Sequence, residues 1–305
     1  VRDGRPYSRI AHLAEDVRPF VAVGWALGEA GFSAPEILAL DLPRGLLLLE
    51  DLGDRVFGAE MRETTPQPLL WRAATEVLIA LRRMPPGIDL PLPDGSTYSL
   101  PRFNRAALEI ESELLLDWYW PEVKGALAPA SDRAEFRALW SPVLDRLLGE
   151  PPGWFLRDFH SPNLLWLPER QGIARVGIID FQDALAEPYA FDLASLLQDA
   201  RVDVPAALEA ELLEFYCATV ARAEPGFDRA GFAATYAAFA AQRNTRLIGL
   251  WVRLLRRDGK PGYLQHMPRT WGYLERNLAH ASLAALRDWY DRHFPAEIRR
   301  RPITA

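Results

Sequence analysis

The sequence predicts an α+β protein with a small α/β part at the N-terminus and a larger, mainly helical part after it. Three observations lead to this prediction. The apolar run Leu46 to Leu49 is bounded by polar and glycine residues and fits a buried strand. Two more strand-like segments enclose a turn at Gln171-Gly172, and residues 192–294 are almost wholly helical in pattern. We place the boundary between the two parts near Asp51 to Arg55.

The first thirty residues contain turn and helix signals. Asp3-Gly4 is a hairpin-turn dipeptide and predicts that two strands meet there. A helix fits Arg18 to Ala30, because Pro19 is tolerated in a first turn and Gly31 can end the helix. The chain begins with Val1 rather than Met, so we expect most of the first strand to lie upstream.

The middle of the chain alternates helices, a loop and two short strands. Helical periodicity covers Pro68 to Arg83, Ala106 to Tyr119 and Arg133 to Leu148. The segment from Met84 to Pro101 is rich in Pro, Gly and Asp and predicts an ordered loop. Asn163 to Leu167 and Ala174 to Ile179 predict a single β-hairpin within the helical part.

Composition excludes several classes of function. The 305 residues carry a net charge of -6 with a pI near 5.5, which argues against a nucleic-acid or anionic-membrane surface. No apolar run approaches the ~20 residues that a membrane span requires, and no signal-peptide pattern is present. Cys217 is the only cysteine, which favours a reducing compartment. We expect a cytoplasmic protein that acts on a small molecule, without an obligate protein partner.

Three oxygen-bearing side chains are predicted to converge at the open end of the central hairpin. If its strands pair around the Gln171-Gly172 turn, positions whose numbers sum to 343 face each other, which places Asn163 opposite Asp180. Asp158 precedes Asn163 by five residues, in a loop held by Pro162. Taken singly, such residues are common in turns and caps. Their joint spacing and the apolar strands that flank them favour a functional site.

This arrangement suits phosphoryl transfer from a nucleotide. Mg²⁺ prefers oxygen ligands and is usually held by one or two carboxylates together with substrate phosphates. Phosphoryl transfer also requires an Asp that orients the attacking hydroxyl and accepts its proton. We therefore interpret Asp158 as the catalytic base, and Asn163 and Asp180 as ligands of Mg²⁺ beside ATP.

The pattern Asp158, Asn163, Asp180 resembles the catalytic and metal-binding loops of the protein-kinase-like superfamily and, within it, the aminoglycoside phosphotransferase family. The resemblance implies a bilobal protein-kinase-like fold. Residues 1–53 would then form an incomplete nucleotide-binding lobe, and residues 54–305 a helical catalytic and acceptor-binding lobe. Phe191-Asp192-Leu193-Ala194 matches the family's element whose Asp braces the catalytic loop, although Asp192 taken alone would be a helix N-cap.

A narrower resemblance covers about residues 18–280. LRDFHSPNLLWLPER, GIIDFQDAL, GLLLLEDLG and MPRTWGYLERNL are similar to segments of the bacterial anomeric kinases of N-acetylmuramate and N-acetylglucosamine, which act in peptidoglycan recycling. The resemblance implies an amino sugar of the cell wall as the phosphate acceptor.

The sequence departs from kinase-like proteins at the phosphate-binding end. It contains no Gly-rich loop, whose expected place lies before Val1. No lysine precedes Lys124, so the strand lysine that usually pairs with the α- and β-phosphates is absent. Arg9 or His12 could take this role, or both could be surface residues.

Candidate ligand-binding residues lie at both ends of the site. Leu46 to Leu52 resembles the hinge between lobes, which implies that the backbone around Glu50, Asp51 and Leu52 binds adenine; a core strand followed by a turn is an equally compatible interpretation. Candidates for the acceptor are Arg157, Asp183 and, more weakly, Gln182.

Further acceptor candidates lie in the helical part. Arg243 and Arg246 are three residues apart on one helix face and could bind a carboxylate in a bidentate manner, or could be solvated. Trp118, Tyr119 and Trp120 could stack on a sugar ring, although such aromatic residues usually belong to a core.

Other functions are weaker fits. A metal-dependent hydrolase could use Asp158 and His160, but none of the other four histidines is near His160 in sequence. A nucleotide-binding regulator without activity would explain the missing lysine, whereas the retained Asp158, Asn163 and Asp180 argue against it. The same fold could act on an aminoglycoside, choline or homoserine, but an aminoglycoside pocket should be lined with carboxylates, and the candidates here are rich in Arg.

Overall fold

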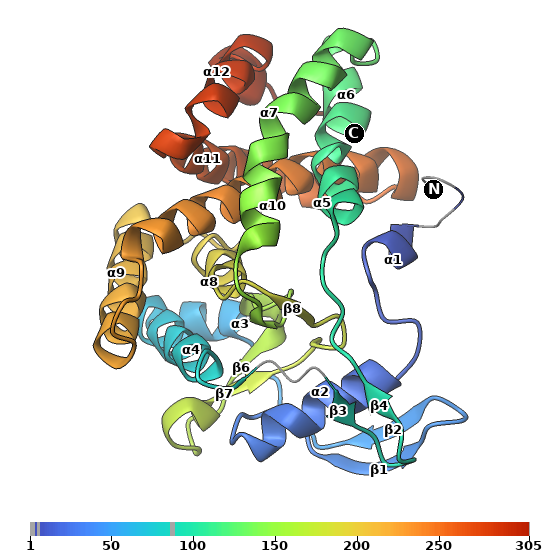
Figure 1. The fold of residues 1–305 in the computed structure, drawn as a ribbon, viewed down its shortest axis with the longest axis vertical. Helices are drawn as coiled ribbons and strands as arrows, with labels where there is room; N and C mark the ends of the chain where they lie inside the picture. Colours follow the sequence, from blue (N-terminus) through green and yellow to red (C-terminus); the bar gives the residue numbers. More distant parts are fainter. Residues whose placement is uncertain (1–3, 5–6, 86–88, 305) are drawn as a thin grey trace. The chain divides into compact units, whose positions relative to one another are not determined.

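The computed structural model describes the chain apart from residues 1–3, 5–6, 86–88 and 305 (Figure 1). Its contacts divide the chain into two compact units, each made of two separate stretches. The first joins Val1–Phe103 to Pro151–Arg229, and the second joins Asn104–Glu150 to Ala230–Ala305. The lobe boundary predicted near Asp51 to Arg55 is a different division and stays a prediction.

The first unit combines helices with four short strand pairs. Its helices are α1 (Tyr7–Ile10), α2 (Arg18–Glu29), α3 (Phe57–Glu63), α4 (Gln67–Leu81), α8 (Ala190–Leu197) and α9 (Ala206–Ala223). Its strands are β1 (Ile37–Asp41), β2 (Leu46–Leu49), β3 (Leu90–Pro91), β4 (Thr97–Tyr98), β5 (Gly153–Phe155), β6 (Leu164–Trp166), β7 (Val176–Ile178) and β8 (Leu185–Glu187). The pairs β1–β2, β3–β4, β5–β8 and β6–β7 are all antiparallel.

The predicted helix after residue 17 is confirmed as α2. Asp16 Oδ1 accepts a hydrogen bond of 2.8 Å from Arg18 N and so satisfies one of the free N–H groups of the first turn. The chain leaves the helix through Gly31, whose φ of +83° is costly for residues with a Cβ. The strands predicted around Asp3-Gly4 are not confirmed. Asp3 lies outside the described residues, and Tyr7–Ile10 is helical instead.

The run Leu46 to Leu49 is a strand with the predicted bounds, but the prediction that it is buried is wrong. Leu46 and Leu48 are each 60 % exposed. β2 pairs only with β1 in the described residues, so alternate side chains of this two-stranded hairpin face solvent. An unbroken apolar run does not reveal whether one or both faces of a strand are covered.

The central hairpin β6–β7 forms as predicted, with a register that differs by one residue. Cross-strand partners have numbers that sum to 342 rather than 343. Asn163 O therefore accepts from Ile179 N (3.1 Å), and the predicted backbone pairing of Asn163 with Asp180 is wrong. The connection is longer than a tight turn, because it includes a 3₁₀ turn at Gly172–Arg175.

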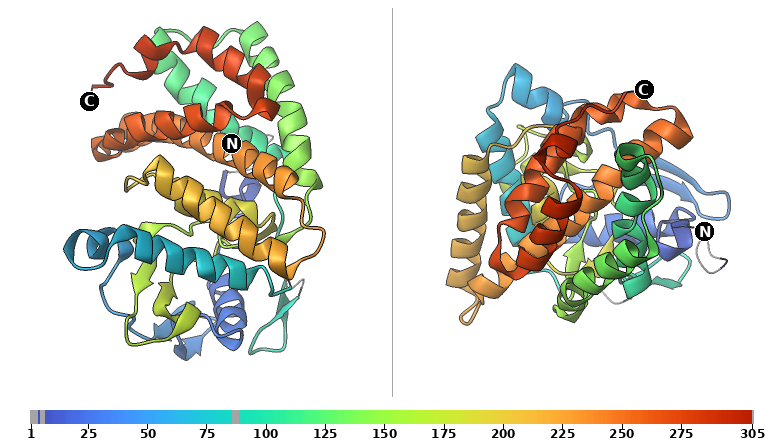
Figure 2. Two further views of the ribbon diagram at one scale, coloured as in Figure 1. Left: turned by 90° about the vertical axis from the view of Figure 1, so that its left-hand side faces the viewer. Right: turned by 90° about the horizontal axis from the view of Figure 1, so that it is seen from above.

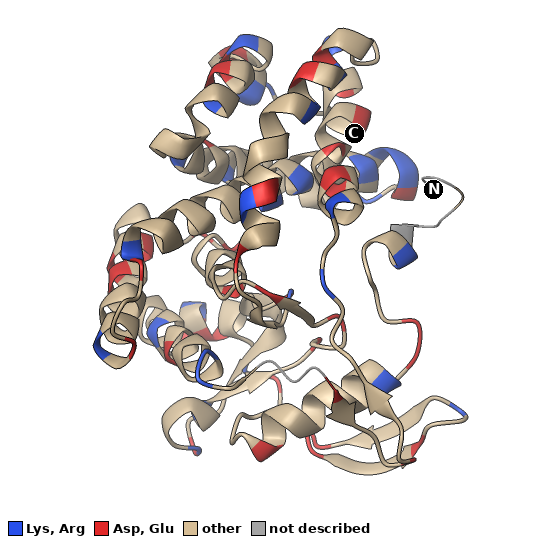
Figure 3. Ribbon diagram, viewed as in Figure 1, with Lys and Arg blue, Asp and Glu red and all other residues tan. Residues whose placement is uncertain are grey.

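The loop predicted for Met84 to Pro101 contains the small β3–β4 hairpin, which the sequence analysis missed. Helices α3 and α4 contact the central hairpin, α3 at β6 and α4 at β7. α4 lies beside both α8 and α9 (Figures 1 and 2). Its fully buried Trp71 donates from the indole N–H to Leu196 O of α8 at 3.0 Å, which anchors α8 in the core. Residues of both charges occur on α4 and on α9 (Figure 3).

The second unit consists of helices and connecting loops, without a strand in its described part. The mainly helical stretch expected between residues 192 and 294 is confirmed across both units. Its helices are α5 (Arg105–Ser112), α6 (Trp120–Lys124), α7 (Ala130–Gly149), α10 (Arg229–Asp258), α11 (Met267–Leu278), α12 (Ala284–His293) and α13 (Ala296–Arg299). The first residue of α10, Arg229, is still assigned to the first unit. A Cβ at Gly249 would lie 2.2 Å from the Leu114 carbonyl carbon, so only glycine permits α10 to approach the backbone at Leu114 this closely. None of the described helices combines the length and apolarity of a membrane span.

Candidate active site

The loop that carries Asp158 is held in place by Asp192 of α8. Asp192 Oδ2 accepts from Leu156 N at 2.6 Å, and its Oδ1 accepts from Arg157 N at 3.0 Å. The Asp192 side chain is buried, so these charge-assisted bonds lie away from water. Arg157 has a left-handed backbone with φ of +71°, a strained conformation for a non-glycine residue. Asp192 therefore stabilises the unusual backbone that presents Asp158.

Asp158 lies at the end of this braced loop with its side chain partly exposed. His160 Nε2 is 3.6 Å from Asp158 Oδ1, and the Arg201 guanidinium lies 3.3 Å from the same histidine nitrogen. The backbone carbonyl of Asp158 accepts from His160 N at 3.0 Å and from the side-chain amide of Asn163 at 3.0 Å. The Asn163 side chain therefore links the end of the loop back to the backbone of Asp158.

Asn163 and Asp180 meet through their side chains. Asn163 Nδ2 donates to Asp180 Oδ2 at 3.0 Å, and Gln182 Nε2 donates to the other Asp180 oxygen at 2.8 Å. The left-handed backbone of Asp180 (φ +61°) brings its carboxylate back toward Asn163 despite the register. The predicted proximity of the two residues is confirmed, with a different geometric cause.

This donor set fits a hard cation. The amide nitrogen of Asn163 is used for two hydrogen bonds, to Asp158 O and to Asp180, so the amide oxygen is the atom that could bind a metal. Each Asp180 oxygen accepts one hydrogen bond in this network and has a second acceptor position. An amide oxygen beside a carboxylate is the ligand chemistry that Mg²⁺ prefers.

Asp183 and Arg157, two predicted acceptor-binding residues, both contact the segment before α2. Asp183 Oδ1 accepts from Ala14 N at 2.6 Å, and Arg157 Nη1 donates to Ala11 O at 2.7 Å. Burial raises the pKa of Asp183, and the nearby Asp158 and Asp180 carboxylates act in the same direction. Asp183 therefore shares the electrostatic environment of the loop that carries Asp158, and its role in binding an acceptor stays a prediction.

Arg9 and His12, the two residues considered for the phosphates, border a pocket of about 380 Å³ in the first unit. Arg9 forms an exposed ion pair with Glu15 at 3.1 Å. Burial, with Arg157 nearby, lowers the pKa of His12. Their assignment to a phosphate contact stays a prediction.

The predicted nucleotide hinge follows β2 directly. Glu50 N donates to Glu36 O at 2.8 Å, so the N–H of Glu50 belongs to the β1–β2 hairpin. Asp51 Oδ1 accepts from Gly53 N at 2.7 Å and forms a turn. Leu52 packs on the central hairpin, where its Cδ1 is 3.2 Å from the place that a Cβ on Gly177 would take.

The two predicted acceptor arginines of the helical part belong to the second unit. Arg246 pairs with the buried Glu111 at 3.4 Å, and Gln242 also donates to Glu111 at 3.3 Å. Arg243 is buried on the same helix. Their predicted role toward an acceptor remains untested. Tyr119 and Trp120 are buried among aromatic rings, as is typical of a core.

Asp199 was missed by the sequence analysis. It is fully buried, and its Oδ2 accepts from Ser161 N at 2.7 Å, next to the Asp158 loop. The available signal was its spacing. Asp199 follows Asp192 by seven residues and lies just beyond the end of α8, in a mainly apolar stretch where a buried carboxylate is unusual. Two carboxylates therefore hold the loop, one on each side of Asp158.

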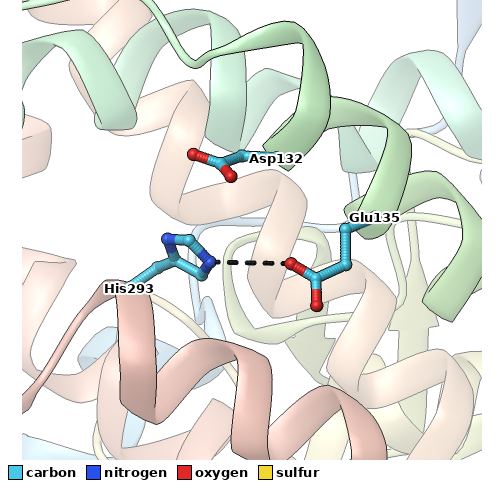
Figure 4. Close-up of side chains that lie close together, drawn as sticks. All are labelled: Asp132, Glu135 and His293. Atoms are coloured by element: carbon cyan, nitrogen blue, oxygen red, sulfur yellow. Dashed lines mark ion pairs between the residues drawn. The ribbon is translucent and has the colours of Figure 1, made fainter.

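A separate group of possible metal ligands lies in the second unit, where Asp132 and Glu135 of α7 face His293 of α12 (Figure 4). Glu135 already forms an ion pair with Arg292 at 2.6 Å, and His293 is 3.9 Å from Glu135. His293 also packs against the ring of Trp289. These contacts explain the cluster as an ion-pair network.

An aspartate on a braced loop, next to an Asn–Asp pair at the mouth of a hairpin, is the arrangement of a kinase-like phosphotransferase. The chain belongs to the phosphotransferase enzyme family, which matches residues 2–234. The α+β fold agrees. A choline/ethanolamine kinase family protein from Mesorhizobium loti has a similar structure, with a TM-score of 0.56 and 17% identity, over 88% of this chain and 84% of that one.

Relatives with closer sequences carry a narrower name. An N-acetylmuramate/N-acetylglucosamine kinase of Caulobacter vibrioides is 39% identical over 295 residues, which are 96% of this chain and 80% of the relative. A protein of the same name from Pseudomonas putida is 32% identical over 264 residues, 85% of this chain and 73% of the relative.

Proposed function

We propose that this ATP-dependent phosphotransferase is a sugar kinase that transfers the γ-phosphate of ATP to the anomeric hydroxyl of N-acetylmuramate and N-acetylglucosamine. The substrate assignment rests on the 39% identity, over nearly the whole chain, to a kinase named for these two sugars. The braced loop of Asp158 supports the reaction type. We place the reaction in the cytoplasm, in the recycling of peptidoglycan.

In this proposal Asp158 accepts the proton of the anomeric hydroxyl while the sugar oxygen forms its bond to the γ-phosphorus and ADP leaves. The partly exposed position of Asp158 at the loop end allows a hydroxyl to approach it. Asn163 Oδ1 and the Asp180 carboxylate would hold Mg²⁺, which supplies positive charge to the nucleotide phosphates when bound. Asp192 keeps the base in position, because it fixes the two peptide N–H groups that precede it.

We further assign residues 1–53 to the nucleotide lobe and residues 54–305 to the catalytic and acceptor lobe. Backbone groups of Glu50, Asp51 and Leu52 would bind adenine; the Glu50 N–H is excluded because it bonds to Glu36. Acceptor hydroxyls would contact Arg157 and Asp183. Arg243 and Arg246 would bind the lactyl carboxylate of N-acetylmuramate, since a guanidinium can bind a carboxylate in a bidentate manner.

A substrate panel tests this proposal. The purified chain is incubated with ATP, Mg²⁺ and N-acetylmuramate, N-acetylglucosamine, choline, homoserine or an aminoglycoside, and ADP formation is measured. We expect turnover on the two amino sugars, with ³¹P NMR showing a phosphate on the anomeric carbon. The Asp158→Asn variant serves as the control for contaminating kinases. Turnover on choline with none on either amino sugar would overturn the substrate assignment.

A further inference from the structure

Arg170 joins three segments that are distant in sequence. It lies in the connection between β6 and β7, and its Nη1 donates to Ser33 Oγ at 2.7 Å. Its Nη2 forms an ion pair with Glu50 Oε1. The side chains of Arg170 and Glu50 are 35% and 29% exposed, so the contact is partly shielded from water. One guanidinium therefore links the central hairpin to residues on both sides of the β1–β2 hairpin.

The two partners of Arg170 close the base of that hairpin. Ser33 precedes β1, and Glu50 follows β2 immediately. Glu50 also accepts from Glu36 N through its Oε2 at 3.2 Å, while its own N–H donates to Glu36 O. Arg170 thus binds the hairpin where its two strands enter and leave, and fixes this base to the β6–β7 connection.

Further contacts continue from this point along β7. Ser33 Oγ donates to Ala174 O at 2.7 Å, and Ser33 O accepts from Ile178 N at 2.9 Å. Leu52, two residues beyond Glu50, packs over Gly177 of the same strand. The segment predicted to bind adenine therefore lies on the strand that leads to Asp180.

We propose that Arg170 is a positioning residue for the nucleotide, because it holds the Glu50–Leu52 segment at a fixed place over the hairpin that carries Asn163 and Asp180. This inference rests on the proposed function, since it requires a nucleotide between these two points. Arginine suits the task because its planar fork presents separate N–H groups to two acceptors, whereas lysine offers a single point charge. Partly exposed ion pairs contribute little to stability, about 0–1 kcal/mol. A displaced Glu50–Leu52 segment, in contrast, would offer its binding groups to the nucleotide in the wrong place, which weakens nucleotide binding more than it slows the transfer step.

Steady-state kinetics with each substrate varied tests the role. We expect Arg170→Ala to raise KM for ATP about tenfold, with KM for the sugar changed less than twofold and kcat less than threefold. The KM for ATP of Arg170→Lys should lie between that of Arg170→Ala and that of the wild type. Arg44→Ala is the matched control, because Arg44 forms an exposed ion pair with Asp41 (3.7 Å) at the far end of the same hairpin. It should leave all three constants unchanged.

A double-mutant cycle tests whether Arg170 acts through Glu50. Glu50→Gln keeps the backbone and an acceptor for Glu36 N but removes the charge. We expect it to raise KM for ATP by a similar factor, and the double variant to be no worse than Arg170→Ala alone. If the KM for ATP of the double variant instead rose by the product of the two single increases, Arg170 would not act through Glu50. A uniform fall in activity with unchanged KM for ATP would show that Arg170 affects only folding.

Binding measured without sugar separates this inference from the proposed function. Titration calorimetry with ATP and Mg²⁺ should show binding to the wild type and about tenfold weaker binding to Arg170→Ala. If the wild type binds no nucleotide, the proposed function fails. If the wild type binds ATP and phosphorylates sugar while Arg170→Ala binds ATP equally well, only the role of Arg170 is refuted.

Discussion

The side-chain amide of Asn163 donates to Asp180 Oδ2 at 3.0 Å although the backbones of these two residues do not pair. The left-handed conformation of Asp180 makes this contact possible. The same amide also donates to the backbone carbonyl of Asp158. One asparagine therefore sets the spacing between the loop of the proposed base and the carboxylate proposed to bind the metal.

Replacement of Asp180 tests the metal assignment. Asp180→Asn removes the charge that would hold Mg²⁺ and places an amide beside the Asn163 amide. We expect kcat/KM to fall at least about 100-fold, which corresponds to a loss of about 2.7 kcal/mol of transition-state stabilisation. The Mg²⁺ concentration for half-maximal rate should rise, as measured from initial rates over a Mg²⁺ series. Glu169→Gln, the same change at an exposed position of the same hairpin, should have no effect. An unchanged Mg²⁺ dependence in Asp180→Asn would refute the assignment.

Replacement of Asp158 tests the base. Asp158→Asn preserves the size of the side chain and the backbone bonds of the loop, but the amide cannot accept a proton. We expect kcat to fall about 10²–10⁴-fold, the range typical of a general base. Nucleotide binding, measured by calorimetry in the absence of sugar, should stay within about threefold of wild type. A kcat near that of the wild type would show that another group takes the proton.

Local patterns in the sequence were sufficient for most elements of the fold. α2 and the long helical stretch follow from periodicity and from Pro and Gly signals, and the central hairpin follows from two short apolar segments around a turn. The same patterns brought Asn163 and Asp180 together. They gave the wrong register, because neither the 3₁₀ turn at Gly172–Arg175 nor the positive φ of Asp180 has a signal that counting residues can detect.

Features that depend on tertiary contacts were not predictable in this way. The exposure of Leu46 and Leu48 depends on what covers the β1–β2 hairpin, which a run of four leucines does not specify. The interaction of Arg170 with Ser33 and Glu50 joins residues up to 137 positions apart. Such contacts arise only when the whole unit is folded, so a single sequence offers no local pattern for them.

The Asp192 brace should be needed for both stability and turnover. Asp192→Asn retains one acceptor oxygen, so one of the N–H groups of Leu156 and Arg157 would face the new amide nitrogen. A buried donor without an acceptor costs about 1–3 kcal/mol, and we expect a loss of about 2 kcal/mol in urea unfolding together with a kcat at least tenfold lower.

Thr75→Val separates these two effects. Thr75 is fully buried in α4 and donates to Trp71 O at 2.8 Å, so its replacement should cost about 1 kcal/mol of stability without changing kcat. If Asp192→Asn lowered stability but left kcat as high as in Thr75→Val, the aspartate would serve only to fold the loop and not to position Asp158.

Glu187 should make the folded chain less stable as the pH rises toward 7. This buried side chain on β8 accepts from Phe103 N at 2.6 Å, and burial raises its pKa from 4.5 to about 7. The folded state therefore binds a proton between pH 4.5 and 7 that the unfolded state releases. Its stabilising contribution is complete below pH 4.5 and is lost as the pH passes through 7, by about 3 kcal/mol in all.

Urea unfolding measured from pH 4.5 to 8.5 tests this expectation. Glu187→Gln keeps an acceptor for Phe103 N but cannot ionise, so its stability should vary less with pH over this range and exceed that of the wild type at pH 8. Glu60→Gln is the opposite control. Hydrogen bonds from Arg55 lower the pKa of Glu60 to about 2, so its contribution is present above pH 4.5 and is lost only as the pH falls toward 2. Between pH 4.5 and 8.5 Glu60→Gln should therefore keep the slope of the wild type, whereas an unchanged slope between pH 4.5 and 7 in Glu187→Gln would refute the role of Glu187.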